Sequence, residues 1–577
     1  MFERLGKLLQ TAAFAADALA TRATAPLHAG VENKIRTPVR LHGAPQDLRT
    51  ADPTVAAEIV AGYFTFEGRL LDTGGASPFD LAPPSPDWRR ALAGFSWLRH
   101  LRAEGGEDAR EAARVLVEDF VTLGRVAPDD PAMEPEVAAR RILGFLAHAP
   151  MLLDGADPQF ARLFLDGLGR EARSLARGLA GRGLGAERLP CALALLEFAL
   201  CAGAEGEVKA HANRLFGLEL ERQILPDGGR VSRNPQAMLD MLLDLLPLRK
   251  LYAARGVNPP STLLAAISAM IPMLRLLQHG DGNLALFNGM GATNPGALAT
   301  VFAHEQTGSG RADAPHSGYA RLRAGEASVV VDVGSPPPSD YSAGAHAGTL
   351  SFEFSLGPER VVVNCGAPPA RHAEAREAAR ATAAHSTLTL DDQSSSVIAP
   401  PSDKAGSGRI LAGAKTTPAR RRHLRMGEAL DAAHDGYATR YGLRHERILA
   451  LTRNGGRLVG QDRLTAIRSV VKPDVTRPFA LRFHLHPSVS VRPRLDGFGA
   501  ELTLPSGQRL IFEASAPATL EESVFFAAPG GARATTQIVL TGRADTATRL
   551  RWSFSKASES EVDAGASAES EAGGTAP

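Results

Sequence analysis

The stretch HAGTLSFEFSLGPERVVVNCG at residues 346–366, followed by TAAHSTLTLDDQSSS at residues 382–396, decides the fold of the C-terminal half. Short runs of alternating apolar and polar residues are bounded by Gly, Pro, Asp or Ser, which is the pattern of β-strands. Similar runs recur after residue 315, as in ASVVVDV, FALRFHLHP, AELTLP, TQIVLTG and TRLRWSFS. About a dozen such strands without intervening helices indicate stacked antiparallel sheets.

The residues before about position 310 follow a different period. Apolar residues recur at i, i+3, i+4 and i+7 in ARRILGFLAHAPMLL, FARLFLDGLGREARSLARGLA, PCALALLEFALCAGA and QAMLDMLLDLLPLRKLYAARG. Short Gly, Pro and Asp punctuation separates these runs, so the helices should pack as antiparallel hairpins. Either a bundle or a toroid of hairpins satisfies this pattern.

The composition is that of a globular protein with a large core. The chain has 577 residues, of which 44% are hydrophobic and 22% are charged, and its net charge is +1. This balance gives no electrostatic reason to expect nucleic acid or a membrane as a partner, although a local basic groove could still hold an acidic sugar. The three cysteines have no CxxC spacing and indicate neither a zinc ribbon nor a disulfide framework.

The N-terminal stretch MFERLGKLLQTAAFAADALATRATA is interrupted by Gln10 and Asp17, and Glu3 stands where a signal peptide would be basic. We therefore predict an amphipathic helix here and not a signal peptide. No apolar run reaches about 18 residues, so we expect no transmembrane segment. The expected compartment is the cytoplasm.

Polar residues stand at the ends of three predicted strands in the opening stretch. His346 precedes one strand, Asn364 and Cys365 end the next, and His385 starts a third. Adjacent antiparallel strands could bring these groups to one edge of a sheet, where they could bind a metal or line a sugar site. Alternatively, the histidines are hydrogen-bonded structural residues at strand ends.

The same stretch resembles the C-terminal sheet domain of the heparinase II/III family of polysaccharide lyases. Further motifs occur in the family's order, including a segment that opens the sheet domain and two segments of the helical half that belong to the family's cleft. The matching residues are His346-Ala347-Gly348, Leu350-Ser351-Phe352-Glu353, Asn364-Cys365-Gly366, Ala384-His385-Ser386-Thr387, Ser317-Gly318-Tyr319 with Arg321, Pro226-Asp227-Gly228-Gly229, Ser232-Arg233-Asn234-Pro235 and His279-Gly280-Asp281-Gly282.

The resemblance implies an α+β multidomain fold, in which an N-terminal (α/α) toroid of helical hairpins precedes an antiparallel β-sandwich. We expect a helix- and loop-rich segment at residues 1–85, the toroid at 86–310 and the sandwich at 311–557. A tail at residues 558–577, rich in Ser, Glu, Ala and Gly, should be disordered. Relatives of this kind are often exported, so the periplasm or cell envelope is the alternative compartment.

The activity implied by the resemblance is β-elimination at a uronic acid of an acidic polysaccharide or oligosaccharide. Such a reaction needs a group that neutralises the carboxylate, a base for the C5 proton and an acid for the leaving oxygen. We assign the carboxylate to Arg230, Arg233 and Asn234, and proton transfer to His346 and Tyr341. Asn234 can also be the N-cap of a helix that begins at Pro235.

The family's catalytic Tyr has no counterpart at its expected place, where the chain has Asn288. We expect Asn288 and His385 to help bind the sugar, and Tyr437 and His445 to face it or to pair within the sheet. Tyr319 should pack against the sheet as a strand residue.

No cofactor is required for this chemistry. Some family members hold a structural zinc, and the matching positions here are His346, Asn364 and His385. Asn364 would supply a neutral ligand where the family has an anionic one. A second hypothesis is a non-catalytic or altered-activity relative that binds a glycan of the cell envelope. The missing Tyr, Gly348 in place of an Asp, and the lack of an export signal motivate it.

Overall fold

The computed structural model describes residues 30–557, apart from residues 123–126, 128, 181–184, 306–309, 370, 401–407, 468–476 and 545–547. The predicted N-terminal helix and the predicted C-terminal tail both lie entirely outside the described residues. In the part of the chain that is described, no helix combines the length and apolarity that crossing a membrane requires.

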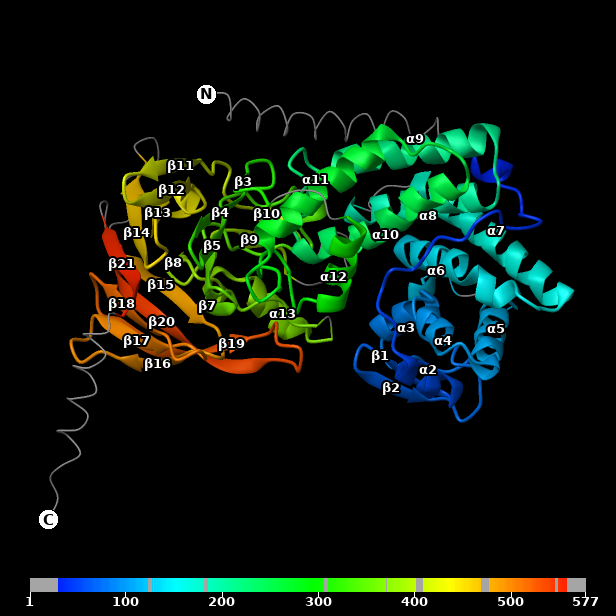
Figure 1. Ribbon diagram of the computed structural model, residues 1–577, viewed down its shortest axis with the longest axis horizontal. Coiled ribbons are helices and arrows are strands. Elements are labelled where there is room, and N and C mark those ends of the chain that lie inside the picture. Colours follow the sequence, from blue (N-terminus) through cyan, green and yellow to red (C-terminus); the bar gives the residue numbers. More distant parts are fainter. Residues whose placement is uncertain are drawn as a thin grey trace, which may run out of the picture.

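Helices make up most of the N-terminal half (Figure 1). Several of them begin with the same local signal, a capping side chain followed by proline, as at Asp52, Ser85, Asn234 and Asn294. The helices are α2 (Pro53–Val60), α3 (Pro86–Ala93), α4 (Leu98–Glu104), α5 (Glu107–Thr122), α6 (Pro135–Leu153), α7 (Pro158–Ala180), α8 (Arg188–Cys201), α9 (Gly206–Gln223), α10 (Pro235–Ala254), α11 (Ser261–Leu277) and α12 (Pro295–His304).

Alternate helices pack on one another. Helix α8 is buried along its whole length from Leu189 to Cys201, because apolar residues cover all of its faces. It contacts α6 and α10, while α9 contacts α11 outside them. The inner and outer helices form the α/α toroid that the resemblance implied. A hairpin of β1 (Tyr63–Phe66) and β2 (Arg69–Asp72), which the sequence analysis did not anticipate, lies beside α2.

As predicted, two large antiparallel sheets make up most of the C-terminal half, and β9 and β10 form a separate two-stranded sheet. One has the order β19-β20-β15-β7-β6-β5-β4-β3 with β8 also paired to β15, and the other β11-β12-β13-β14-β21-β18-β17-β16. The strands are β3 (Asp313–Ala314), β4 (Tyr319–Ala324), β5 (Ala327–Asp332), β6 (Phe352–Leu356), β7 (Glu359–Val363), β8 (Leu388–Leu390), β9 (Val397–Ile398), β10 (Ile410–Ala412), β11 (Ala419–Leu424), β12 (Gly427–His434), β13 (Leu443–Thr452), β14 (Arg457–Ala466), β15 (Arg477–Leu485), β16 (Ser490–Pro493), β17 (Gly499–Thr503), β18 (Arg509–Ala514), β19 (Ala518–Phe525), β20 (Arg533–Ala544) and β21 (Arg549–Lys556).

The first sheet is covered on both faces. Every residue of β5 is buried. Val329 and Val331 pack into the core between the two sheets, whereas Val330 packs with the helices, as does Val363 of β7. Side chains of a strand alternate between faces, so the molecule has three layers: helices, first sheet and second sheet. Polar residues at the edge of the first sheet therefore meet the helical half.

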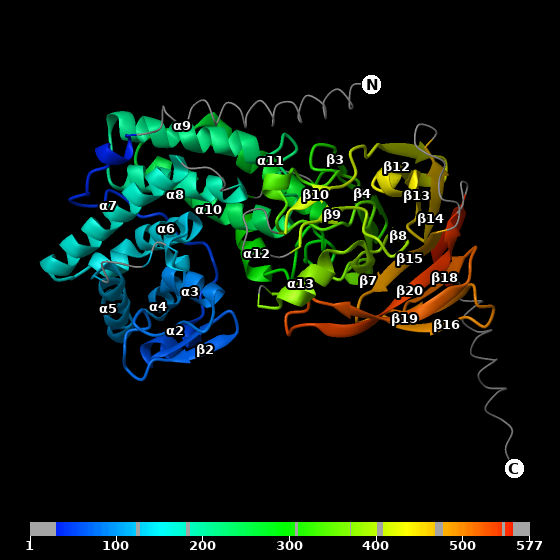
Figure 2. The ribbon, with the colours of Figure 1, turned by 180° about the vertical axis from the view of Figure 1, so that it is seen from behind.

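Short helices occur in the connections. Helix α13 (Ala373–Arg380) follows β7, and both views place it at the boundary between helices and sheets (Figures 1 and 2). Helix α14 (Ala438–Tyr441) follows β12, and a 3-10 turn at Ser339–Tyr341 precedes His346.

Candidate active site

The segment from Ser339 to His346 lies at the junction of the two halves. Its 3-10 turn packs against a second turn, Gly185–Glu187, which precedes α8. Arg230 is buried near Tyr341, and its Nη2 donates to Gln223 Oε1 at 2.6 Å and to the Ala186 carbonyl at 3.3 Å. Burial lowers the pKa of Arg230, while nearby acidic groups, Tyr341 among them, oppose that shift. Arg230 and the turn that carries Tyr341 therefore both contact the Gly185–Glu187 turn.

Arg233 connects the helical half to the first sheet. It has a positive φ of 60°, and its guanidinium donates to the carbonyls of Ser317, Gly318 and Ser335 and to Asp332 Oδ1, at 2.5–3.0 Å. These contacts use donors that the sequence analysis assigned to a substrate carboxylate. The structure thus places Arg233 as a clamp between the halves instead of as an open sugar-binding cation.

Asn288 lies next to this clamp and reaches His346. Its Nδ2 donates to Tyr319 Oη at 2.8 Å and to Asp332 Oδ2 at 3.3 Å, and its Oδ1 accepts from the His346 backbone N–H at 3.4 Å. Tyr319 in turn donates to the Arg233 carbonyl, and burial raises its pKa. Asn288 therefore positions the His346 backbone, and Tyr319 packs on β4 as expected.

The predicted cap at Asn234 is confirmed. Its Oδ1 accepts from the backbone N–H groups of Gln236 and Ala237, at 2.8 and 3.4 Å, at the start of α10. Its Nδ2 lies beside Gly289 and near the Gly344 carbonyl, because a Cβ built on Gly289 would come within 3.1 Å of Nδ2 and 2.6 Å of that oxygen. Asn234 thus stands between the Asn288 loop and the segment that leads to His346.

His346 and His385 form a direct pair. His346 Nδ1 lies 3.1 Å from His385 Nε2, and His385 Nδ1 lies 2.8 Å from the Ala381 carbonyl. A carbonyl only accepts, so His385 carries its proton on Nδ1 and accepts from His346 Nδ1–H. The lone pair of His346 is consequently on Nε2, which no described residue contacts by a hydrogen bond. Burial lowers the pKa of both rings, that of His385 to about 4, so both are neutral at neutral pH.

Two arginines of α13 lie near this pair and were not singled out from the sequence. Arg380 is buried and donates through Nε to the Ala345 carbonyl at 2.9 Å and through Nη2 to the Ser342 carbonyl at 3.3 Å. Arg376 is half-buried, acts electrostatically on His346, and has no side-chain hydrogen bond within the described ranges. The Ala-, Arg- and Glu-rich composition of residues 367–384 was the available signal.

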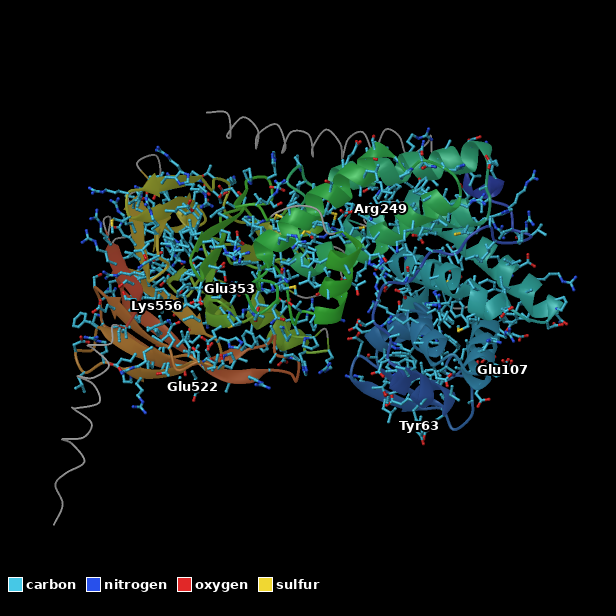
Figure 3. The ribbon with its side chains drawn as sticks, in the orientation of Figure 1. Tyr63, Glu107, Arg249, Glu353, Glu522 and Lys556 are labelled. Carbon is cyan, nitrogen blue, oxygen red and sulfur yellow. The ribbon has the colours of Figure 1, made fainter. Side chains whose placement is uncertain are left out.

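The predicted second cleft loop joins the first sheet through a buried charge. His279 Nε2 lies 3.0 Å from Glu353 Oε2 on β6, and Arg360 Nη2 donates to the same oxygen at 2.6 Å (Figure 3 labels Glu353). Burial alone would raise the pKa of Glu353, but the Arg360 charge and the His279 hydrogen bond lower it to about 2. Since all three side chains are buried and paired with each other, this cluster holds the junction together.

The structure corrects the sugar-binding role that the sequence predicted for Tyr437 and His445. Both are interior residues of the sandwich, 1% and 0% exposed. Tyr437 donates to the Leu388 carbonyl at 2.8 Å, and His445 lies 2.7 Å from Asp462 through Nε2 and 3.3 Å from His434 through Nδ1. Their polar atoms pair within the sheets, which was the alternative left open, so they do not face a sugar.

The residues at the proposed zinc positions do not fit that ion. His346 and His385 are hydrogen-bonded to each other, and Asn364 accepts through Oδ1 from the Ser386 N–H at 3.0 Å. The set has no anionic ligand, and a Cβ at Gly348 would come within 2.7 Å of the His385 ring, which leaves no room there for an Asp. In the described ranges no group of three or more His, Cys, Asp or Glu could hold a metal ion.

Comparisons with known proteins match the chain over most of its length. Residues 306–553 match the family described as heparinase II/III-like, C-terminal. FtsZ-localized protein C of Caulobacter vibrioides is 32% identical over 542 residues, covering 90% of this chain and 91% of that protein. A heparinase III crystal structure has a TM-score of 0.71 at 14% identity, covering 96% of this chain and 92% of that one. A heparan sulfate lyase HepC mutant from Pedobacter heparinus has a TM-score of 0.60 at 16% identity, covering 95% and 90%. These structural likenesses establish the fold.

Proposed function

Because this chain belongs to the heparinase II/III-like family, we propose that it is a lyase that cleaves a uronic-acid-containing polysaccharide or oligosaccharide by β-elimination. In this reaction a base takes the C5 proton of the uronate and the bond from C4 to the glycosidic oxygen breaks. A double bond forms between C4 and C5, and the leaving oxygen takes up a proton. Water is not consumed.

The unpaired Nε2 lone pair of His346 is the observation that carries the proposal. The Ala381 carbonyl fixes the proton of His385, His385 fixes that of His346, and the remaining nitrogen is the base. A neutral imidazole is the form that a general base needs, and the lowered pKa of His346 keeps it in that form. Asn288 holds the His346 backbone in place.

Removal of the C5 proton places negative charge on the uronate carboxylate, so the site needs a donor there. We assign this role to Arg376 on α13, whose charge acts on His346, together with the Nδ2 of Asn234. Arg376 takes the role that the sequence analysis gave to Arg233, because the guanidinium of Arg233 is hydrogen-bonded to residues of the sheet half. We retain Tyr341 as the acid for the leaving oxygen, because the neighbouring Arg230 charge favours the phenolate that results.

The test is turnover of a panel of uronate polymers by the full chain, followed by absorbance of the unsaturated product. We expect one polymer to be cleaved, and His346→Ala to lower the rate by at least about 10²-fold while polymer binding is retained. His423→Ala is the matched control, because His423 lies on β11 with a side chain 78% exposed. A folded wild type that is inactive on every polymer, or a fully active His346→Ala variant, would contradict the proposal.

A second candidate function follows from the relative named FtsZ-localized protein C, which covers nearly the whole chain at 32% identity. In this alternative the protein is a non-catalytic glycan-binding relative that localises with FtsZ. Fluorescent fusions of the wild type and of His346→Ala, imaged together with FtsZ, test it. Equal co-localisation of both proteins, without turnover of any polymer, would favour this candidate, whereas a diffuse distribution of both would contradict it.

A further inference from the structure

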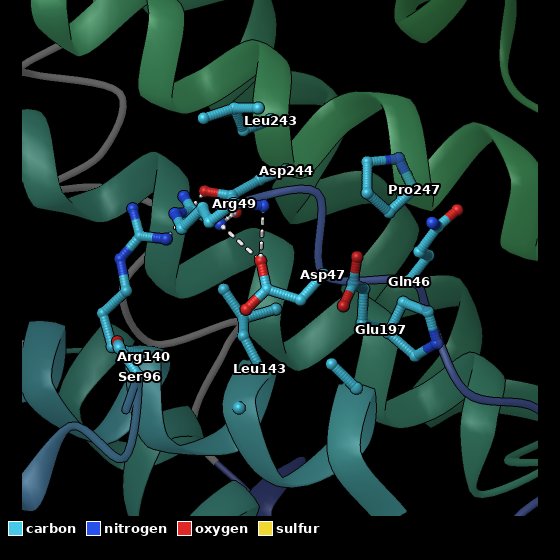
Figure 4. A pocket seen from close by; sticks show the side chains of 13 residues that line it. Gln46, Asp47, Arg49, Ser96, Arg140, Leu143, Glu197, Leu243, Asp244 and Pro247 are labelled. Carbon is cyan, nitrogen blue, oxygen red and sulfur yellow. Dashed lines mark hydrogen bonds and ion pairs between the residues drawn. The ribbon is translucent and has the colours of Figure 1, made fainter. Parts of the chain in front are cut away.

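The helical half contains a pocket away from His346 whose lining combines charged and apolar residues (Figure 4). It has a volume of about 40 Å³ and lies among the inner helices α6, α8 and α10, next to the chain at residues 45–49. Its charged lining residues are Asp47, Arg49, Arg140, Glu197 and Asp244. Such a volume has room for about three water-sized groups.

Four of these charges are already balanced. Arg49 Nη1 donates to Asp244 Oδ1 at 2.7 Å, and Arg140 Nη1 donates to Asp244 Oδ2 at 2.8 Å. Asp47 Oδ1 accepts from the Arg49 backbone N–H at 3.0 Å. Burial would raise the pKa of Asp47, but His148, whose Nε2 lies 3.6 Å from Asp47 Oδ2, and the Arg49 charge lower it to about 2. Two carboxylates and two guanidiniums thus sum to zero net charge.

Glu197 is the remaining ionisable group of the lining. It is 2% exposed, and within the described residues its carboxyl takes part in no hydrogen bond or ion pair. Figure 4 shows it next to Asp47, on the side away from Arg140. Burial raises its pKa well above the usual value, and the Asp244 charge adds to that shift. A buried carboxyl that lines a pocket without a donor is costly unless a ligand supplies one.

We propose that this pocket binds a primary ammonium group, carried by a small free amine or by the end of a lysine side chain. One positive charge is what an ionised Glu197 would need, because the other four charges already cancel. Asp47 and Glu197 offer carboxylate oxygens to the ammonium hydrogens, and Pro45, Leu143 and Pro247 are apolar lining residues against which the attached methylene groups can pack. A bare metal ion is a poorer fit, since the described residues hold no metal-binding cluster.

The test measures the melting temperature of the full chain with about 0.1 M ethylammonium chloride, against equal concentrations of sodium chloride and of ethanol. We expect ethylammonium to raise it by about 2 °C or more above both controls. Glu197→Gln should lose this excess, because the amide keeps the shape of the carboxyl but cannot ionise. Glu118→Gln, on the exposed face of α5, should keep it. Nα-acetyl-lysine methylamide, tested in the same way, separates the two sources of the ammonium group.

A second readout needs no variant. Ethylammonium should remove the infrared band of one protonated carboxyl from the wild-type chain and add that of a carboxylate. The proposal is overturned if ethylammonium raises the melting temperature no more than sodium chloride does, if Glu197→Gln responds like the wild type, or if the infrared bands stay unchanged. The first of these outcomes would leave the pocket as a site for water.

Discussion

At the scale of single residues, a chain of hydrogen bonds decides which nitrogen of His346 is basic. The Ala381 carbonyl orients His385, and His385 orients His346. Replacing His385 with Phe keeps a ring but removes the acceptor, so His346 can place its proton on either nitrogen. We expect kcat to fall by about 10-fold, less than in His346→Ala, with KM nearly unchanged. Steady-state kinetics on the cleaved polymer measures this, and a change in KM alone would argue against a positioning role.

The second residue of consequence is Arg233. Its guanidinium bonds three carbonyls and Asp332 at the junction, and its removal leaves Asp332 buried without its cation. We expect Arg233→Ala to cost about 3–5 kcal/mol, seen as a lower melting temperature. Arg249→Ala is the control, since the more exposed Arg249–Glu305 pair is worth about 1 kcal/mol or less. Equal losses for both variants would contradict the clamp.

At the scale of elements, the start of α10 combines a cap with a candidate substrate contact. Asn234 caps through Oδ1, and its Nδ2 is the proposed donor to the uronate. Asp is as good an N-cap as Asn, but it lacks the N–H donor and brings negative charge. Asn234→Asp should therefore keep the melting temperature within about 1 °C and lose most of the turnover. Loss of stability together with activity would instead assign Asn234 to the cap alone.

Strand β6 gives the junction a dependence on pH. Glu353 has a folded pKa of about 2, below its ordinary value of 4.5. A depressed carboxyl pKa contributes stability that is complete above the ordinary value and is lost as the pH falls toward the folded value. The contribution is about 3 kcal/mol at neutral pH. Denaturant unfolding should show the stability gap between wild type and Glu353→Gln shrinking from pH 6 to pH 3, and a constant gap would refute this.

At the scale of the whole molecule, the periodicity of apolar residues predicts the helical half and the sheet half, but it does not predict how the two halves pack against each other. Period-two runs predict strands correctly, and alternate residues of β5 do pack on opposite sides. Both faces of this sheet are covered because the helices pack on one of them, and no local sequence pattern encodes that packing. Tyr437 and His445 illustrate the limit, because a polar residue in a strand looks the same whether it faces a sugar or a buried partner.

The candidate site is likewise only partly readable from the sequence. His346, His385, Asn234 and Asn288 come together because their motifs end strands or begin helices at the junction. Arg376 comes from a segment without such a motif, and its charge acts on His346 because of the placement of α13. The helical and sheet halves thus supply complementary parts of the candidate site.

The claim that this junction performs β-elimination is tested most directly by letting the protein digest its uronate polymer in water labelled with heavy oxygen. The masses of the oligosaccharide products are then measured by mass spectrometry. Elimination takes no oxygen from water, so we predict products with a C4–C5 double bond and no heavy oxygen, formed by the wild type and lost in His346→Ala. Products that carry heavy oxygen, or unsaturated products formed equally by His346→Ala, would contradict the account.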